Sequence, residues 1–263
     1  MNDFLLGIRT YFDAHKLISK NNLWGYVLLP GLINLVLFSI TIWIGWEYSK
    51  KLTSWLMEII GIEAIAIASW GFIKTVVHYL FLLLFRLMSF LFYMFIYKYV
   101  VLIIMAPVLA ILSEKTDEII SGNRYPFKLG QFLKDVLRGI IIALRNLGIE
   151  LFLIIVLFFT SFIPVIGLLS PLLIIIVECY FYGFSMIDYS NERQKLTVRQ
   201  STAFIGRHKG VAIANGAMFY LLWLVPLFGL MVAPSYGVVA AAIAADKIRN
   251  RQKELKSTVS EIR

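Results

Sequence analysis

The sequence predicts an all-α polytopic membrane protein with two long transmembrane helices and two Pro/Gly-turned, partly penetrating helical hairpins. Of its 263 residues, 60% are hydrophobic and 16% are charged, whereas soluble domains have about 45–50% and about 25%. Apolar runs long enough to cross a bilayer recur along the chain, and two of them share a Pro-x-x-Gly interruption. This composition excludes a cytosolic enzyme and a secreted disulfide scaffold, and we treat residues 1–263 as a single integral membrane domain.

The first apolar run predicts a transmembrane helix over residues 23–46, after a cytoplasmic N-terminal segment over residues 1–22. No Asp, Glu, Lys, Arg or His occurs from Asn21 to Trp46. About 20 such residues, rising 1.5 Å each, span a hydrocarbon core of about 30 Å. Aromatic side chains such as Trp24 stand near both ends, where they suit the headgroup zones.

A long second helix is predicted over residues 64–113. About 50 residues in one helix extend about 75 Å, which is too long for one simple crossing. We therefore expect the crossing near residues 87–112, with the earlier, charge-bearing part at an interface or outside the lipid. Arg86 lies in a strongly apolar run and is a candidate for an aqueous pathway, with an interfacial position as the alternative.

Two later blocks, residues 147–189 and 210–246, resemble an internal repeat of helical hairpins. Their predicted turns fall at Pro164, Gly167, Pro226 and Gly229. Proline ends the incoming helix, and glycine is expected to supply unusual backbone angles. The incoming arms, of 13 and 15 residues, reach only about 20 and 22 Å, so the hairpins should enter the membrane and turn back. Such paired breaks also point to a substrate site at membrane depth; breaks that only turn the chain are the alternative.

The distribution of positive charge supports this topology. The chain has 25 Lys and Arg against 16 Asp and Glu, a net charge of +9, and basic residues concentrate on the cytoplasmic side of membrane proteins. Hairpins place every basic-rich loop inside, including five basic residues between Ser190 and Lys209. The basic C-terminal tail, residues 247–263, is expected to contact anionic lipid headgroups and not nucleic acid.

Several short motifs follow one another in a fixed order along nearly the whole chain. They are Lys16-Leu17, Val27-Leu28-Leu29-Pro30 with Asn34, Ala106-Pro107, Leu112-Ser113-Glu114, Ser121-Gly122, Lys134-Asp135-Val136-x-Arg138, Phe162-Ile163-Pro164-x-Ile166-Gly167, Asp188-Tyr189, and Pro226-Leu-Phe-Gly-Leu with Asp246. In this order they resemble the CysZ-type sulfate permease family, which is related to the eukaryotic etoposide-induced membrane proteins. The resemblance implies the two-helix, two-hairpin fold in a homo-oligomer of the bacterial inner membrane, with sulfate as the substrate.

The start of the first span is the predicted anion site. Sulfate-handling members of the family typically carry Gly-(apolar)-Arg-Arg just before the first-span proline, whereas the aligned residues here contain no arginine. Open helix N-terminal amides, two nearby lysines and a glycine that permits close approach still predict a weak, salt-sensitive site. Its candidate residues are Lys16, Lys20, Asn22, Leu23, Trp24 and Gly25. Ordinary helix capping and headgroup contact are the alternative explanation.

Glu178 and Asn215, in the late hairpins, are further candidates for a pathway. The sequence has no metal-ligand, ATP-binding or common hydrolase motif, so we expect no cofactor, no metal and no enzyme activity. The predicted function is a permease-like membrane protein for inward passage of a small oxyanion, sulfate by resemblance, without its own ATPase. A non-transporting membrane scaffold or lipid-organising protein of the same fold is the alternative.

Overall fold

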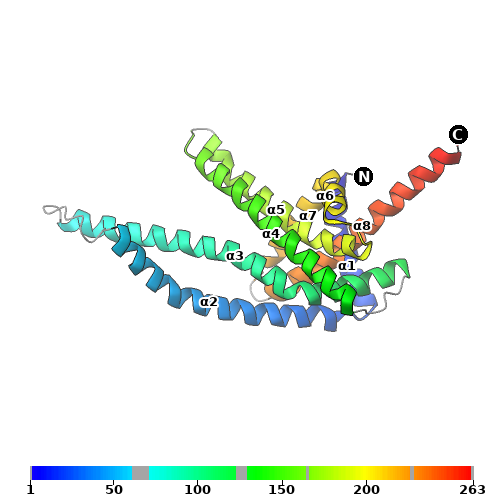
Figure 1. Ribbon diagram of the computed structural model, residues 1–263, viewed down its shortest axis with the longest axis horizontal. Helices are drawn as coiled ribbons and strands as arrows, with labels where there is room; N and C mark the ends of the chain where they lie inside the picture. Colours follow the sequence, from blue (N-terminus) through cyan, green and yellow to red (C-terminus); the bar gives the residue numbers. More distant parts are fainter. Residues whose placement is uncertain (1, 61–70, 123–128, 164–165, 226–227, 262–263) are drawn as a thin grey trace. The chain divides into compact units, whose positions relative to one another are not determined.

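The structure, a computed structural model, describes residues 2–60, 71–122, 129–163, 166–225 and 228–261. Over these residues the chain forms eight helices and no strand (Figure 1). The helices are α1 (Asp3–Lys20), α2 (Trp24–Ile60), α3 (Gly71–Ser121), α4 (Leu129–Thr160), α5 (Ile166–Arg193), α6 (Val198–Arg207), α7 (Lys209–Trp223) and α8 (Phe228–Glu261). The prediction of an all-α protein is confirmed.

Four of the described helices are long and apolar enough to cross a membrane. The segments are Trp24–Ile44, Leu133–Thr160, Gly167–Arg193 and Met231–Thr258. The first agrees with the predicted span at residues 23–46. However, α2 continues to Ile60, because residues 46–60 contain neither glycine nor proline to stop the helix.

The second long helix, predicted over residues 64–113, corresponds to α3, which is continuous from Gly71 and ends at Ser121 and not at residue 113. Its last turns remain helical because polar side chains pair within the helix. Lys115 donates to Glu118 at 2.7 Å, and the Thr116 hydroxyl donates to the Leu112 carbonyl at 2.8 Å. Residues 61–70, where we expected the helix to begin, lie outside the described residues.

The chain divides into two compact units. One contains Met1–Leu35 and Ile103–Arg263, and the other contains Val36–Leu102. The second unit comprises the later part of α2 and the first part of α3, together with residues outside the description. The sites described below belong to the first unit, whereas Arg86 belongs to the second.

The predicted hairpin turns lie between α4 and α5 and between α7 and α8. The expected length of the first incoming arm is wrong. In place of a 13-residue arm, α4 runs for 32 residues from Leu129. The sequence predicts a loop for the residues before this arm, whereas they continue the helix, and polar groups such as Asn146 and Glu150 are buried there. By contrast, α7 has the expected 15 residues. Pro164 and Pro226 lie outside the described residues.

The two turn glycines act by close approach and not, as expected, by unusual backbone angles. Neither Gly167 nor Gly229 has a positive φ. A Cβ atom at Gly167 would overlap the carbonyl oxygen of Ser161, and one at Gly229 would overlap that of Leu222. In both hairpins, therefore, the second helix starts directly against the last turn of the first, and the absence of a side chain permits it.

Buried residues of α1, α2, α3 and α8 form a hydrophobic core cluster, and α5 packs on α7 and α8. The closest approach is between α5 and α7, where small residues four apart on each helix face each other. A Cβ at Gly183 would overlap the Ala212 carbonyl oxygen, and a Cβ at Gly216 would overlap the Cys179 carbonyl oxygen. Such small-xxx-small pairs let helix backbones pack closely in membranes.

The N-terminal segment, to which the sequence assigned only a cytoplasmic position, forms the 18-residue helix α1. It packs on α7 and α8, burying Tyr11, Ala14 and Ile18. The Tyr11 hydroxyl donates to the Asn215 carbonyl at 2.8 Å. Burial raises the pKa of Tyr11 well above its usual range, so the group is a neutral donor.

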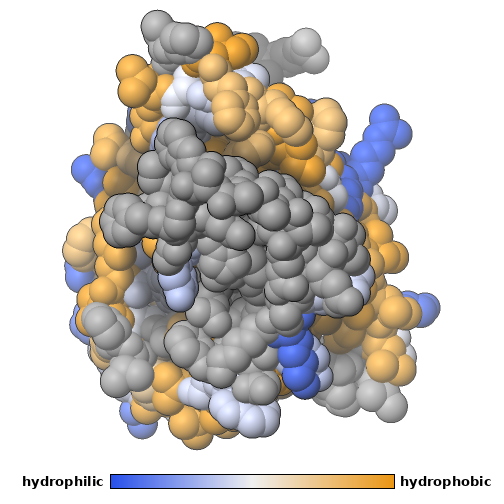
Figure 2. Space-filling view, turned by 90° about the vertical axis from the view of Figure 1, so that its left-hand side faces the viewer, coloured by the Kyte–Doolittle hydropathy of each residue, from blue (hydrophilic) through white to orange (hydrophobic). Residues whose placement is uncertain are grey.

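Apolar side chains are exposed at the tip of the α4–α5 hairpin. Leu168 is 85% exposed, Phe162 is 72% exposed and Phe159 is 66% exposed. Figure 2 shows hydrophobic side chains predominating over the described part of one face, with few hydrophilic ones. A surface of this kind suits lipid or another subunit and not water.

Candidate functional site

The predicted anion site lies at the junction of α1 and α2, where the chain turns within three residues. Asn22 has a φ of 54°, and the Leu23 amide donates to the Ile18 carbonyl at 3.0 Å. The Asn21 side chain donates to the Leu17 carbonyl at 2.9 Å. Asn21 therefore closes the end of α1 and leaves the start of α2 without a side-chain cap.

The first amides of α2 are open, as predicted. Tyr26 and Val27 both donate to the Leu23 carbonyl, whereas the amides of Trp24 and Gly25 have no hydrogen bond in the described part of the chain. Gly25 is exposed, and a Cβ built on it would meet no atom within 4 Å. Open amides at a helix N-terminus carry partial positive charge and can bind an anion.

Lys16 and Lys20 lie on the last turns of α1, next to this junction. Both are exposed and neither forms an ion pair within the described residues. Leu23, by contrast, is 6% exposed and belongs to the hydrophobic core, so it anchors the turn and offers no side chain to a ligand. The lysines therefore lie on the helix before the turn, and the open amides lie on the helix after it.

The sequence did not identify His15 and Tyr236 as neighbours of the junction. The His15 ring stacks on Tyr236 of α8 with centroids 6.1 Å apart, and it meets the edge of Trp24 at 6.4 Å. His15 Nδ1 lies 2.7 Å from the Tyr236 hydroxyl. This ring cluster holds α1, α2 and α8 together. No spacing in the sequence links residues 15 and 236.

Two of the candidate pathway residues, Glu178 and Asn215, form hydrogen bonds to other helices. Glu178 accepts a hydrogen bond from Tyr220 at 2.8 Å. Asn215 is fully buried and donates to the Gly237 carbonyl at 3.0 Å, so it joins α7 to α8. Its side-chain oxygen has no partner within the described residues. The Arg86 side chain lies outside the described residues.

A charge network connects α4 with α5 and the segment after it. Arg138 makes two hydrogen bonds of 2.9 Å to the Asp188 carboxylate, and its Nε donates to the Leu196 carbonyl at 3.0 Å. The Ser201 hydroxyl, on α6, also donates to Asp188, at 2.5 Å. This bidentate geometry is the strongest form of an arginine–carboxylate pair.

The network extends to α3 through a second arginine. Arg193 pairs with Glu192 and with Glu114, at 3.2 Å in each case. Each arginine thus pairs with at least one carboxylate, Arg138 with Asp188 and Arg193 with Glu114. Glu118 at 2.7 Å raises the pKa of Lys115 by accepting its hydrogen bond. Among the described residues, no group of carboxylate, histidine or cysteine side chains can hold a metal.

Comparison with known proteins finds a matching family and several relatives that are named as transporters. Residues 10–234 match the family described as "Sulfate transporter CysZ/Etoposide-induced protein 2.4". A sulfate transporter CysZ from Pseudomonas paraeruginosa is 29% identical over 226 residues, covering 85% of this chain and 87% of that protein. The Pectobacterium atrosepticum sulfate transporter CysZ is 27% identical over 246 residues, covering 93% and 86%. That from Pseudomonas syringae pv. tomato is 29% identical over 241 residues, covering 90% of each chain.

Proposed function

We propose, from the premise that this chain belongs to the family of the sulfate transporter CysZ and etoposide-induced protein 2.4, that it is a membrane permease for sulfate. The protein would admit the oxyanion inward without an ATPase of its own and would not act as an enzyme. Two lines support this: its relatives are named sulfate transporters, and four described helices are apolar enough to cross a membrane.

The observation that carries the proposal is the open start of α2. Two unbonded amides, at Trp24 and Gly25, follow the unpaired lysines Lys16 and Lys20 across the turn that joins α1 to α2. A dianion would be held by backbone donors and by two point charges, without the bidentate contacts that arginine gives. We therefore propose a weak site with modest selectivity that fades as salt screens the exposed lysines.

Replacing both lysines, in Lys16→Gln with Lys20→Gln, should abolish saturable sulfate binding in titration calorimetry. The charges are removed while the exposed stems and the turn are kept, so the unfolding midpoint should not change. The control replaces two exposed basic residues of other helices, in Arg199→Gln with Arg251→Gln, and should bind sulfate as the unaltered protein does. Unchanged binding in the lysine variant would place the site elsewhere, as would loss of binding in Arg86→Gln.

The proposal also covers the location of the protein, its oligomeric state and its contact with lipid. We place the protein in the bacterial inner membrane as a homo-oligomer with its basic loops in the cytoplasm. The basic tail would contact anionic lipid headgroups. Contacts of His208 with Asp3 at 2.9 Å and with Gln252 at 3.3 Å support a common side for the N-terminus, the Ser190–Lys209 loop and the tail. The exposed apolar hairpin tip supports contact with lipid or a second copy.

A scaffold without transport is the second candidate function, and one observation favours it. The polar side chains near the hairpin tips are satisfied locally: Thr160 donates to the Leu157 carbonyl and Ser161 to the Phe158 carbonyl. Asn215 likewise donates to a backbone carbonyl. Donors engaged in this way do not line a conducting path within one subunit, so flux, and not binding alone, separates the two functions.

A further inference from the structure

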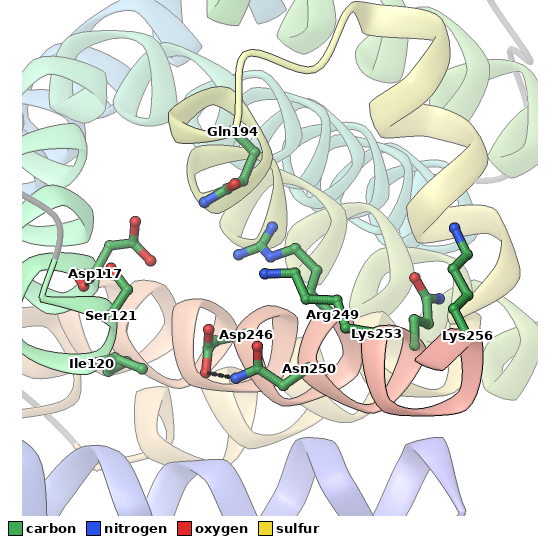
Figure 3. Close-up of a pocket in the computed structure, with 10 residues that line it drawn as sticks. Asp117, Ile120, Ser121, Gln194, Asp246, Arg249, Asn250, Lys253 and Lys256 are labelled. Carbon is green, nitrogen blue, oxygen red and sulfur yellow. Dashed lines mark hydrogen bonds between the residues drawn. The ribbon is translucent and has the colours of Figure 1, made fainter. Parts of the chain in front are cut away.

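A cavity of about 510 Å³ lies where the ends of α3 and α5 meet the later part of α8. Its wall includes Asp117, Ser121, Gln194, Asp246, Arg249 and Lys253 (Figure 3). Its volume falls within the range of about 300–1,000 Å³ that is typical of small-molecule sites. None of these residues belongs to the predicted anion site at the start of α2.

Opposite charges occupy opposite walls of this cavity. Figure 3 shows the carboxylate of Asp117 on one side, and the end groups of Arg249 and Lys253 pointing toward it from the other. Asp246 lies below the gap, where it accepts a hydrogen bond from Asn250 at 2.9 Å. A simple anion here would meet two carboxylates, and a simple cation would meet Arg249 and Lys253.

The basic wall combines a fixed group with an adaptable one. The Arg249 guanidinium donates to the Ser190 hydroxyl at 2.7 Å and lies over the Phe204 ring, 6.0 Å from its centre. Lys253 makes no hydrogen bond or ion pair within the described residues. A planar, preorganised guanidinium beside a mobile ammonium suits a phosphate, which accepts several hydrogen bonds at once.

We propose that this cavity binds a small zwitterion that joins a primary ammonium group to a phosphate. The ammonium would lie against Asp117 and Asp246, and the phosphate would lie between Arg249 and Lys253. Phosphoethanolamine has this chemistry, either as a free molecule or as the headgroup of phosphatidylethanolamine. The site is separate from the proposed sulfate site, and its ligand is not the transported ion.

The test is titration calorimetry of the full chain in detergent with O-phosphoethanolamine as the probe. Saturable binding is expected, and inorganic phosphate and ethanolamine, each supplying half of the ligand, should bind at least about tenfold more weakly. Lys253→Gln and the isosteric Asp246→Asn should each weaken binding about tenfold or more. The matched control is Arg251→Gln, an equal charge change on the same helix outside the cavity wall, which should leave binding unchanged.

Three results would overturn the proposal: no binding of the probe, equal binding of inorganic phosphate, or equal losses in Lys253→Gln and Arg251→Gln. Native mass spectrometry distinguishes the two sources of the ligand. Phosphatidylethanolamine retained by the unaltered protein and lost in Lys253→Gln identifies the lipid. Probe binding without any retained lipid identifies the free molecule. An unchanged unfolding midpoint confirms that each variant is folded.

Discussion

Replacing Gly216 by alanine is expected to lower the free energy of unfolding by about 3 kcal/mol or more, the upper range for overpacking a tight core. A single added methyl group would overlap the Cys179 carbonyl oxygen, because α5 and α7 approach through their backbones at this point. The opposing contact of Gly183 with Ala212 fixes the same separation, so the helices cannot part at one contact alone. Reversible unfolding in mixed detergent micelles, followed by circular dichroism, measures the change.

The same substitution at Gly148 is the control for helix propensity. Gly148 lies in α4, and a Cβ there would meet no atom within 4 Å. Gly148→Ala should therefore stabilise the protein, by up to about 1 kcal/mol, because alanine restricts the unfolded chain more than glycine does. Changes of the same sign at both positions would contradict the close packing of α5 on α7.

Asp188→Asn is expected to cost about 3–5 kcal/mol of unfolding free energy, as when one partner of a buried ion pair is removed. The substitution keeps the shape of the side chain but leaves Arg138, whose side chain is only 15% exposed, without its bidentate partner. Glu192 lies 3.8 Å from the same guanidinium and offsets part of the loss. The unfolding assay described above provides the measurement.

The control for Asp188 is an exposed ion pair of the same charge type. Asp13 pairs with Lys247 at 2.7 Å, with both side chains more than one-third exposed, at 37% and 48%. Asp13→Asn should cost no more than about 1 kcal/mol, because solvent screens the pair. Equal, small losses in both variants would show that the Arg138 network does not hold α4 against α5.

Sequence reasoning succeeded where hydropathy and helix breakers decide the structure. The first span was placed within one residue of Trp24, where α2 begins, and the repeated Pro-x-x-Gly pattern located both hairpin turns. It failed for α1, whose buried face combines apolar residues with small and polar ones such as Gly7 and Thr10. The short helix α6 was also missed, although the capping box of Thr197 and Gln200 was a readable signal.

The sequence predicts groups that are close together along the chain, but it does not predict contacts between distant residues. The lysines at the end of α1 and the open amides at the start of α2 are close in the sequence. Helix-terminus patterns could therefore identify them as candidates. Arg138 and Asp188 are 50 residues apart and were identified only as separate motif residues. Periodicity cannot show that they pair. Arg138 lies in the part of α4 that precedes the predicted arm, so this pair joins the additional length of α4 to α5.

Uptake of radiolabelled sulfate into liposomes that contain only this purified protein, without ATP, tests the proposed transport function most directly. Saturable uptake down a sulfate gradient is expected, well above that of protein-free liposomes and inhibited more by unlabelled sulfate than by equal chloride. Uptake in the variant Lys16→Gln with Lys20→Gln should fall to that of protein-free liposomes. If the unaltered, folded protein admits no more sulfate than protein-free liposomes do, the permease account is contradicted and the scaffold function is favoured.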